Sequence, residues 1–166
     1  MAVLTEEQTM LRDAAKGWAS ESAPVGALRK LRDSKSKQTF DPAAWAEMGQ
    51  MGWAGVIVPE AYDGSAFGYL GLGLILEETG RTLAASPLLS TAMIAASALQ
   101  LGGSDAQKQA WLPKIATGEA VATLSHKRPA GRHGRPDPAP RRGRRRRRDP
   151  LAPVADRLAR GGQDRL

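Results

Sequence analysis

The side chains that could do chemistry in this chain lie mostly in its last quarter. Both histidines, His126 and His133, fall there, and the whole chain has no cysteine. The same stretch contains five consecutive arginines, Arg144 to Arg148, which could bind a phosphate backbone with a strong dependence on salt. No aromatic residue is interleaved with them, so selective stacking on bases is not indicated. Any such binding would be nonspecific binding of RNA or another polyanion.

Residues 1–125 offer few candidates for catalysis. Because they contain neither His nor Cys, a His-based triad or a typical zinc site cannot be built from them. Glu60 lies in a predicted loop without an identifiable partner acid, and we interpret it as structural. Glu77 and Glu78 precede Arg81 by four and three residues, which is the spacing of ion pairs along a helix. We therefore predict no catalytic and no metal-ligating residue in this part.

The charge of the chain changes sign near residue 126. The whole chain carries a formal net charge of +7. Residues 126–166 hold 13 Arg and one Lys against four Asp, a net charge of +10, whereas residues 1–125 carry a net charge of −3. The basic part also has six prolines and no aromatic residue. Low hydrophobicity with high net charge predicts disorder for this tail.

Residues 1–125 show the periodicity and start signals of an all-α bundle of about six helices. Thr5 with Gln8, and Ser104 with Gln107, have the spacing of capping boxes, and Asp41 precedes a proline at a helix start. Helices are predicted at about 5–21, 25–34, 42–52, 68–83, 86–102 and 104–119. The first half of the helix at 68–83 is apolar all round, so we expect it to be buried.

Two short segments are predicted to be extended. The run Val56–Val58 is too short for a helix and ends at a proline, which indicates a buried extended segment followed by a turn-rich loop. The sequence "AVATLS", which ends at Ser125, has the composition of the start of a β-strand.

Three stretches resemble the acyl-CoA dehydrogenase family. "WAEMGQMGWAGVIVPEAYDGSAFG" is similar to the family's Trp-bearing helix and the Gly-rich loop with a Pro-Glu pair that follows it. "LGLILEETGRTLAASPLLST" is similar to the next helix, and "LGGSDAQKQAWLPKIATGEAVATLS" to the helix that leads into the first strand of the flavin domain. The resemblance covers about residues 4–125. "YDGSAFG" departs from it, because the family usually has paired glycines there.

The resemblance implies an FAD-dependent enzyme that oxidises an acyl-CoA thioester between its α and β carbons. In the family an electron-transfer flavoprotein receives the electrons, and the subunits commonly form tetramers. A middle β domain contributes much of the flavin pocket, and a C-terminal helical bundle supplies the catalytic carboxylate. This chain matches only the N-terminal helical domain, so we expect it to be inactive alone and not to retain FAD.

The resemblance also implies where a cofactor would be contacted. Thr123, Leu124 and Ser125 stand where the family begins its flavin contacts, and Ser125 takes the place of a frequent Thr. The family's helical domain helps to wall the acyl pocket, so Ile57 or Phe67 could touch the substrate.

The family continuation "T-E-P-x-x-G-S-D" is absent after Ser125, and "HKRPAGRHGRPD" stands in its place. Residues of GC-rich codons dominate there, which favours translation out of frame. A functional polyanion-binding arm and an inert solvated tail are the other interpretations. The expected organisation is a helical domain at 1–120, the start of a truncated flavin-domain strand at 121–125 and a basic low-complexity tail at 126–166.

Further expectations concern partners and location. The chain could dock onto a fuller acyl-CoA dehydrogenase chain or form an oligomer. It has no run of about 18 apolar residues, so no membrane span is expected. Its N-terminus lacks the order of a signal peptide, and together with the absence of cysteine this favours a cytoplasmic location.

Overall fold

The computed structural model describes residues 3–34 and 37–125, and every regular element in these ranges is helical. The six α-helices are α1 (Glu6–Glu21), α2 (Val25–Asp33), α3 (Pro42–Gln50), α4 (Gly68–Arg81), α5 (Ala96–Gly102) and α6 (Asp105–Ala116). The shorter elements are the 3-10 turns η1 (Trp53–Gly55) and η2 (Glu60–Tyr62) and the π-helix η3 (Leu89–Ala95), which runs directly into α5. The expected all-α bundle of about six helices is confirmed. Nowhere in these ranges does a helix combine the length and apolarity needed to cross a membrane.

Three helices begin at the predicted capping residues. At α1 the Gln8 amide donates to the Thr5 hydroxyl at 3.2 Å, and the Thr5 amide donates to the Gln8 side-chain oxygen at 3.1 Å. Ser104 and Gln107 make the same reciprocal pair at α6, at 3.3 and 2.9 Å. The Asp41 carboxylate accepts from an amide in the first turn of α3 at 2.9 Å. Each bond satisfies an amide that has no intrahelical partner, so local sequence decides these helix starts.

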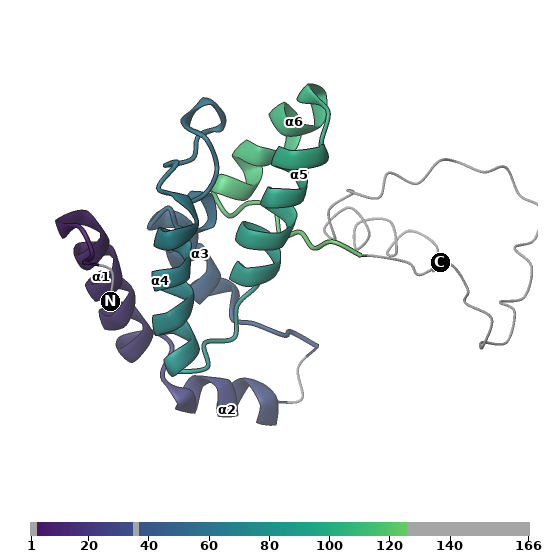
Figure 1. The fold of residues 1–166 in the computed structure, drawn as a ribbon. Helices are drawn as coiled ribbons and strands as arrows, with labels where there is room; N and C mark the ends of the chain where they lie inside the picture. Colours follow the sequence, from purple (N-terminus) through teal and green to yellow (C-terminus); the bar gives the residue numbers. More distant parts are fainter. Residues whose placement is uncertain (1–2, 35–36, 126–166) are drawn as a thin grey trace, which may run out of the picture.

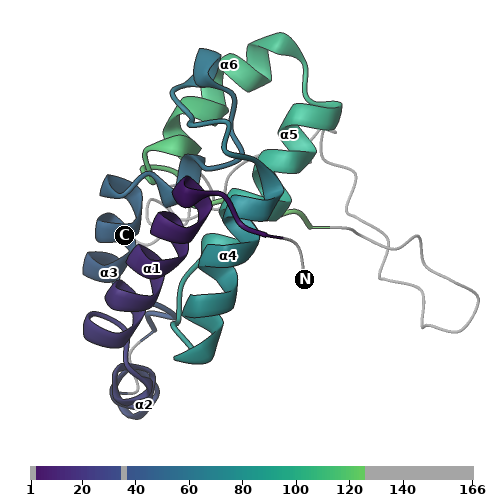
Figure 2. The ribbon, with the colours of Figure 1, turned by 60° about the vertical axis from the view of Figure 1, so that its left-hand side comes forward.

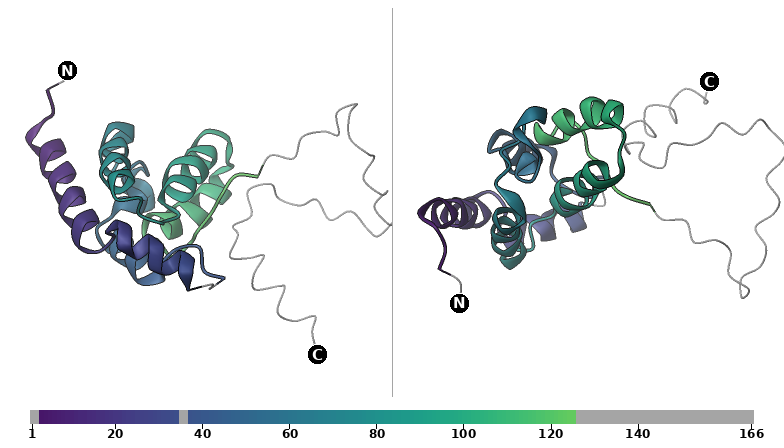
Figure 3. Two further views of the ribbon diagram at one scale, coloured as in Figure 1. Left: turned by 90° about the horizontal axis from the view of Figure 1, so that it is seen from below. Right: turned by 45° about the horizontal axis from the view of Figure 1, so that its top comes forward.

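The helices form a bundle in which α4 is central. It lies between α1 and the continuous helix made by η3 and α5, and it runs antiparallel to the latter (Figures 1 and 2). Viewed from below, α1 forms one outer edge of the bundle (Figure 3). Helix α6 packs against α5 and η1, whereas α2 crosses one end of the bundle and has no buried residue.

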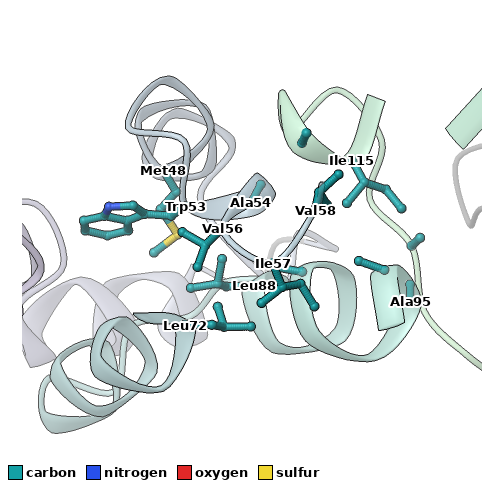
Figure 4. Close-up of a cluster of buried hydrophobic side chains, with 14 of the residues drawn as sticks. Met48, Trp53, Ala54, Val56, Ile57, Val58, Leu72, Leu88, Ala95 and Ile115 are labelled. Carbon is teal, nitrogen blue, oxygen red and sulfur yellow. The ribbon is translucent and has the colours of Figure 1, made fainter. Parts of the chain in front are cut away.

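The core is centred on the segment of residues 53–58 (Figure 4). This segment approaches α6 so closely that a Cβ atom at Gly55 would lie 2.9 Å from the Cβ atom of Ala116. Trp18 packs edge-on against Trp53, with ring centroids 5.3 Å apart. The largest fully buried side chains are Trp53, Met48, Leu72, Ile75, Leu88, Leu112, Ile115, Val58 and Thr91.

The expectation of an extended segment at Val56–Val58 is wrong, although its side chains are buried as predicted. The backbone of Val56 is helical, with φ −56° and ψ −36°. The amide of Val58 donates to the carbonyl oxygen of Gly55 at 3.0 Å. No neighbouring strand lies within the described ranges. The carbonyl oxygens of Val56 and Val58 accept instead from the amides of Phe67 and Ala66, at 2.8 and 2.9 Å, in the loop that returns before α4.

The expected burial of the first half of α4 is also wrong in part. Leu72 is buried, but Tyr69 and Leu70 are more than half exposed, because they lie on the side of α4 that faces away from the core.

Residues 121–125 have no strand partner within the described part of the chain and leave α6 as an irregular segment. The proposed strand start, and the domain boundary before it, therefore stay predictions. The Arg-rich segment 126–166 lies outside the described residues.

Candidate functional site

The candidate flavin-contacting residues follow a tight turn at the end of α6. Gly118 has a φ of +79°, a left-handed conformation that glycine adopts without strain. Its carbonyl oxygen accepts from the indole N–H of Trp45 at 2.8 Å. The amide of Ala120 donates to the carbonyl oxygen of Lys114 at 2.9 Å. These bonds turn the chain away from α6 and direct it along the inner side of η3.

Ala122 is held by both of its backbone groups. Its amide donates to the Thr91 hydroxyl oxygen at 3.2 Å, and the Thr91 hydroxyl donates to its carbonyl oxygen at 3.1 Å. Both residues are buried, and Thr91 is fully so. The two bonds join positions 31 residues apart in the sequence.

Beyond this anchor the chain emerges at the surface. Thr123, Leu124 and Ser125 are all exposed, and they make no hydrogen bond within the described part of the chain. Thr123 and Leu124 border a cavity of only about 10 Å³, whose other lining residues are Ala95, Leu99, Trp111, Ile115 and Ala122. Cofactor sites usually occupy several hundred Å³, so this cavity is far too small for a flavin. The hydroxyls of Thr123 and Ser125 are exposed, so they are open to hydrogen bonding by a group placed beside this segment.

The outer side of η3 is apolar and exposed. Leu89, Met93 and Ile94 are between about 39% and 51% exposed. Met93 and Ile94 follow Leu89 by four and five residues. A turn of a π-helix holds between four and five residues, so all three side chains lie on one side of η3. We call these three side chains the η3 face. The opposite side of η3 carries Thr91, so this helix has the anchor on one side and the η3 face on the other.

Helix α4 is joined to α5 near the η3 face. The Tyr69 and Ser97 hydroxyls are hydrogen-bonded at 2.9 Å. Tyr69 is more than half exposed, so its ring adds apolar surface to α4 beside α5.

Other predicted residues take structural positions. Ile57, suggested as a substrate contact, is buried in the core (Figure 4). Phe67, the other suggested contact, is half-buried and packs against the core. Glu60 is exposed in η2. Among the described residues no group of His, Cys, Asp or Glu could hold a metal ion.

The predicted ion pairs at the end of α4 form. Arg81 lies 2.6 Å from the exposed carboxylate of Glu77 and 3.3 Å from the buried carboxylate of Glu78. All three side chains belong to one helix and pair with each other. We therefore interpret these charged residues as structural and not as catalytic.

A larger cavity of about 370 Å³ lies between α2, the start of α3 and the loop after α4. Its lining is mostly Ala and Leu, with Lys30 and Asp41 among the polar residues. The Asp41 carboxylate already caps α3. The cavity therefore presents no arrangement for catalysis.

Thr91, the η3 face and Tyr69 do not stand out in the sequence as functional candidates. A lone threonine in an uncharged helix is no signal by itself, since threonine hydroxyls in helices commonly bond to the preceding turn. Only the fold brings Thr91 against Ala122.

Comparisons with known proteins agree with this arrangement. Residues 5–119 match the family described as "Acyl-CoA dehydrogenase, N-terminal domain". Acyl-CoA dehydrogenase FadE12 of Mycobacterium tuberculosis is 32% identical over 127 residues, which are 73% of this chain and 30% of that protein. The mitochondrial isovaleryl-CoA dehydrogenase of Pongo abelii is 31% identical over 128 residues, 76% of this chain and 30% of that protein. The chain thus spans about 30% of the length of these curated relatives.

A solved structure gives the same result for the fold. The ChsE4–ChsE5 complex from Mycobacterium tuberculosis contains a chain that superposes with a TM-score of 0.68 at 28% identity. The match covers 79% of this chain and 36% of that one.

Proposed function

The chain belongs to the acyl-CoA dehydrogenase family through its N-terminal domain, and on this premise we propose that its helices form one wall of a flavin-dependent site that oxidises an acyl-CoA thioester. Other parts of the fold complete that site. We further propose that the chain alone neither holds FAD firmly nor oxidises acyl-CoA.

The observation that carries the proposal is that one helix both bears an exposed apolar face and anchors an exposed segment of chain. The η3 face is apolar and lies in the open, and the inner side of the same helix anchors the segment that ends in Thr123, Leu124 and Ser125. Contiguous exposed apolar surface marks a site for a ligand or for other protein surface.

A bound FAD would supply the acceptor for the hydride that leaves the β carbon of the substrate. Thr123 and Ser125 would meet the edge of the flavin with their hydroxyls and backbone groups. The η3 face would line the space for the acyl chain and exclude water from it, which strengthens electrostatic interactions in the site. No residue of this chain is proposed to remove the α proton, because the resemblance to the family assigns that carboxylate to the C-terminal helical bundle.

The proposed site also requires partners. The relatives extend well beyond the matched region, and the middle and C-terminal domains of the family would cover the η3 face. An electron-transfer flavoprotein would receive the electrons from the completed site. Assembly with a fuller acyl-CoA dehydrogenase chain would provide a middle and a C-terminal domain from a second molecule.

The first test measures flavin in the purified chain. We expect no stoichiometric flavin absorbance after expression, and no saturable change in FAD fluorescence on titration with the chain. A purified protein with one FAD per chain would contradict the proposal that other domains are needed.

A domain exchange tests the positive part of the proposal. Residues 1–122 would replace the matching segment of FadE12, and the hybrid should bind FAD and oxidise an acyl-CoA that FadE12 oxidises. FadE12 without that segment is the negative control. In the hybrid, Met93→Gln should raise KM for the acyl-CoA several-fold, whereas Ala110→Gln on the exposed side of α6 should leave it unchanged. A folded hybrid that binds no flavin would overturn the assignment of this wall.

A further inference from the structure

Two buried threonines in neighbouring helices use their hydroxyls in different ways. The Thr79 hydroxyl in α4 donates to the carbonyl oxygen of Ile75 at 2.8 Å, one turn earlier in its own helix. This is the usual local bond of a helical threonine. The Thr91 hydroxyl makes no such bond and instead spans to Ala122, as donor and acceptor at once. The contrast shows that Thr91 serves contact between segments rather than its own helix.

Thr91 lies within the π-helical part of the helix. The amide of Ala96 donates to the carbonyl oxygen of Thr91, five residues earlier, as in a π turn. Such turns are uncommon within helices and often occur at functional sites, since the wider turn changes the direction of the side chains. Here the turn presents the Thr91 hydroxyl to the backbone of residue 122, while Leu89 and Met93 stay exposed on the other side.

The anchor lies at the boundary between held and free backbone. Ala122 is buried and bonded through both its amide and its carbonyl oxygen, whereas Thr123 is exposed and has no hydrogen bond to another described residue. Fixing Ala122 sets the direction in which the next residues leave the helices. Each residue has only two free backbone dihedrals, so a segment of three residues cannot depart far from the direction given by its first fixed peptide group.

We propose that Thr91 is a positioning residue, whose hydroxyl fixes Ala122 so that Thr123, Leu124 and Ser125 leave the helices in one direction. That this direction brings Thr123 and Ser125 to the edge of a flavin rests on the function proposed above. The positioning itself does not depend on FAD. Thr91 touches neither cofactor nor substrate, and it acts only through the backbone of residue 122.

The test uses the 166-residue chain and takes advantage of its lack of cysteine. Ser125→Cys and Gln109→Cys, the second on the exposed side of α6, allow a pair of spin labels to be attached. Electron–electron double resonance then reports the distribution of distances between them. We expect a narrow distribution in the labelled parent and in Thr91→Ser, which keeps the hydroxyl. Thr91→Val, which keeps the shape but loses the hydroxyl, should broaden it at least twofold.

Thr79→Val is the matched control. It removes a hydroxyl from an equally buried helical threonine, so it should lower stability without broadening the distribution. A distribution as narrow in Thr91→Val as in the parent, or already broad in the parent, would overturn the proposal. Equal broadening by Thr79→Val would reduce Thr91 to a general structural role and would overturn it too.

Amide hydrogen exchange of the unlabelled parent keeps the proposal testable if Thr91→Val does not fold. We expect the Ala122 amide to exchange about tenfold or more slowly than the Thr123 amide, because only the former is bonded and buried. Equal exchange rates of the Ala122 and Thr123 amides would show that Thr91 does not hold residue 122. Neither measurement contains FAD, so a failure here is distinct from a failure of the flavin titration.

Discussion

The indole N–H of Trp45 donates to the carbonyl oxygen of Gly118 at 2.8 Å and so links the middle of α3 to the turn that ends α6. The backbones of α3 and of this turn also approach each other closely, since a Cβ atom at Gly118 would lie 3.2 Å from the Cα atom of Gly49. Together with the bonds of Thr91 to Ala122, it holds the segment after α6 at two points four residues apart. The candidate segment therefore starts from a rigid base.

Removing this hydrogen bond should destabilise the domain. Trp45→Phe keeps an aromatic ring in the core but leaves the Gly118 carbonyl without its donor. We expect a loss of about 1–3 kcal/mol in the free energy of unfolding, measured by urea denaturation. Trp111→Phe is the control, because the half-buried Trp111 donates no hydrogen bond to another described residue. An equal or larger loss in Trp111→Phe would show that ring size, and not the bond, is what matters.

Replacing Gly55 by alanine should lower the stability of the domain, whereas replacing Gly73 by alanine should raise it. At Gly55 an added Cβ atom would lie 2.9 Å from the Cβ atom of Ala116, so Gly55→Ala should push η1 away from α6 and destabilise by about 1–3 kcal/mol. At Gly73, inside α4, nothing lies within 4 Å of an added Cβ atom. Gly73→Ala should therefore stabilise by about 0.5–1 kcal/mol through helix propensity. Thermal melting of both variants would check the signs, and destabilisation by Gly73→Ala would contradict the open surroundings of that position.

The η3 face should make the isolated chain self-associate. Exposed apolar surface of this kind promotes association when nothing covers it. We expect the apparent mass in light scattering to rise with protein concentration, and Met93→Gln with Ile94→Gln to reduce that rise. Ala110→Gln, which adds an amide on α6, should not. A chain that stays monomeric at all concentrations would show that the η3 face is not adhesive by itself.

The Arg-rich segment should prove to be encoded out of frame. Resequencing across codons 115–170 and translating all three frames should yield, after Ser125, an acidic and glycine-containing continuation in another frame. If neither other frame gives such a sequence, the segment belongs to the protein as it stands. Retention on RNA, weakening steeply with salt and lost on deletion of residues 126–166, would then identify a polyanion as its partner.

Much of the helical fold could be predicted because its signals are local. The capping boxes at Thr5 and Ser104 form within four residues, and the ion pairs of Arg81 form within one turn of a helix. The six helices followed from these signals and from the apolar periodicity. The lack of His and Cys before residue 126 likewise excluded several kinds of catalytic and metal site from composition alone.

The tertiary structure alone decided the geometry of the candidate site. Val56–Val58 turn rather than extend, because their partners are a turn bond to Gly55 and the amides of the returning loop 66–68, and no strand lies beside them in the described part of the chain. The anchor of Thr91 to Ala122 and the bond of Trp45 to Gly118 join residues 31 and 73 positions apart. Such contacts depend on how whole helices pack against each other, and the residues that make them carry no mark in their immediate sequence. Sequence alone therefore determined which helices form, and packing determined which side chains meet.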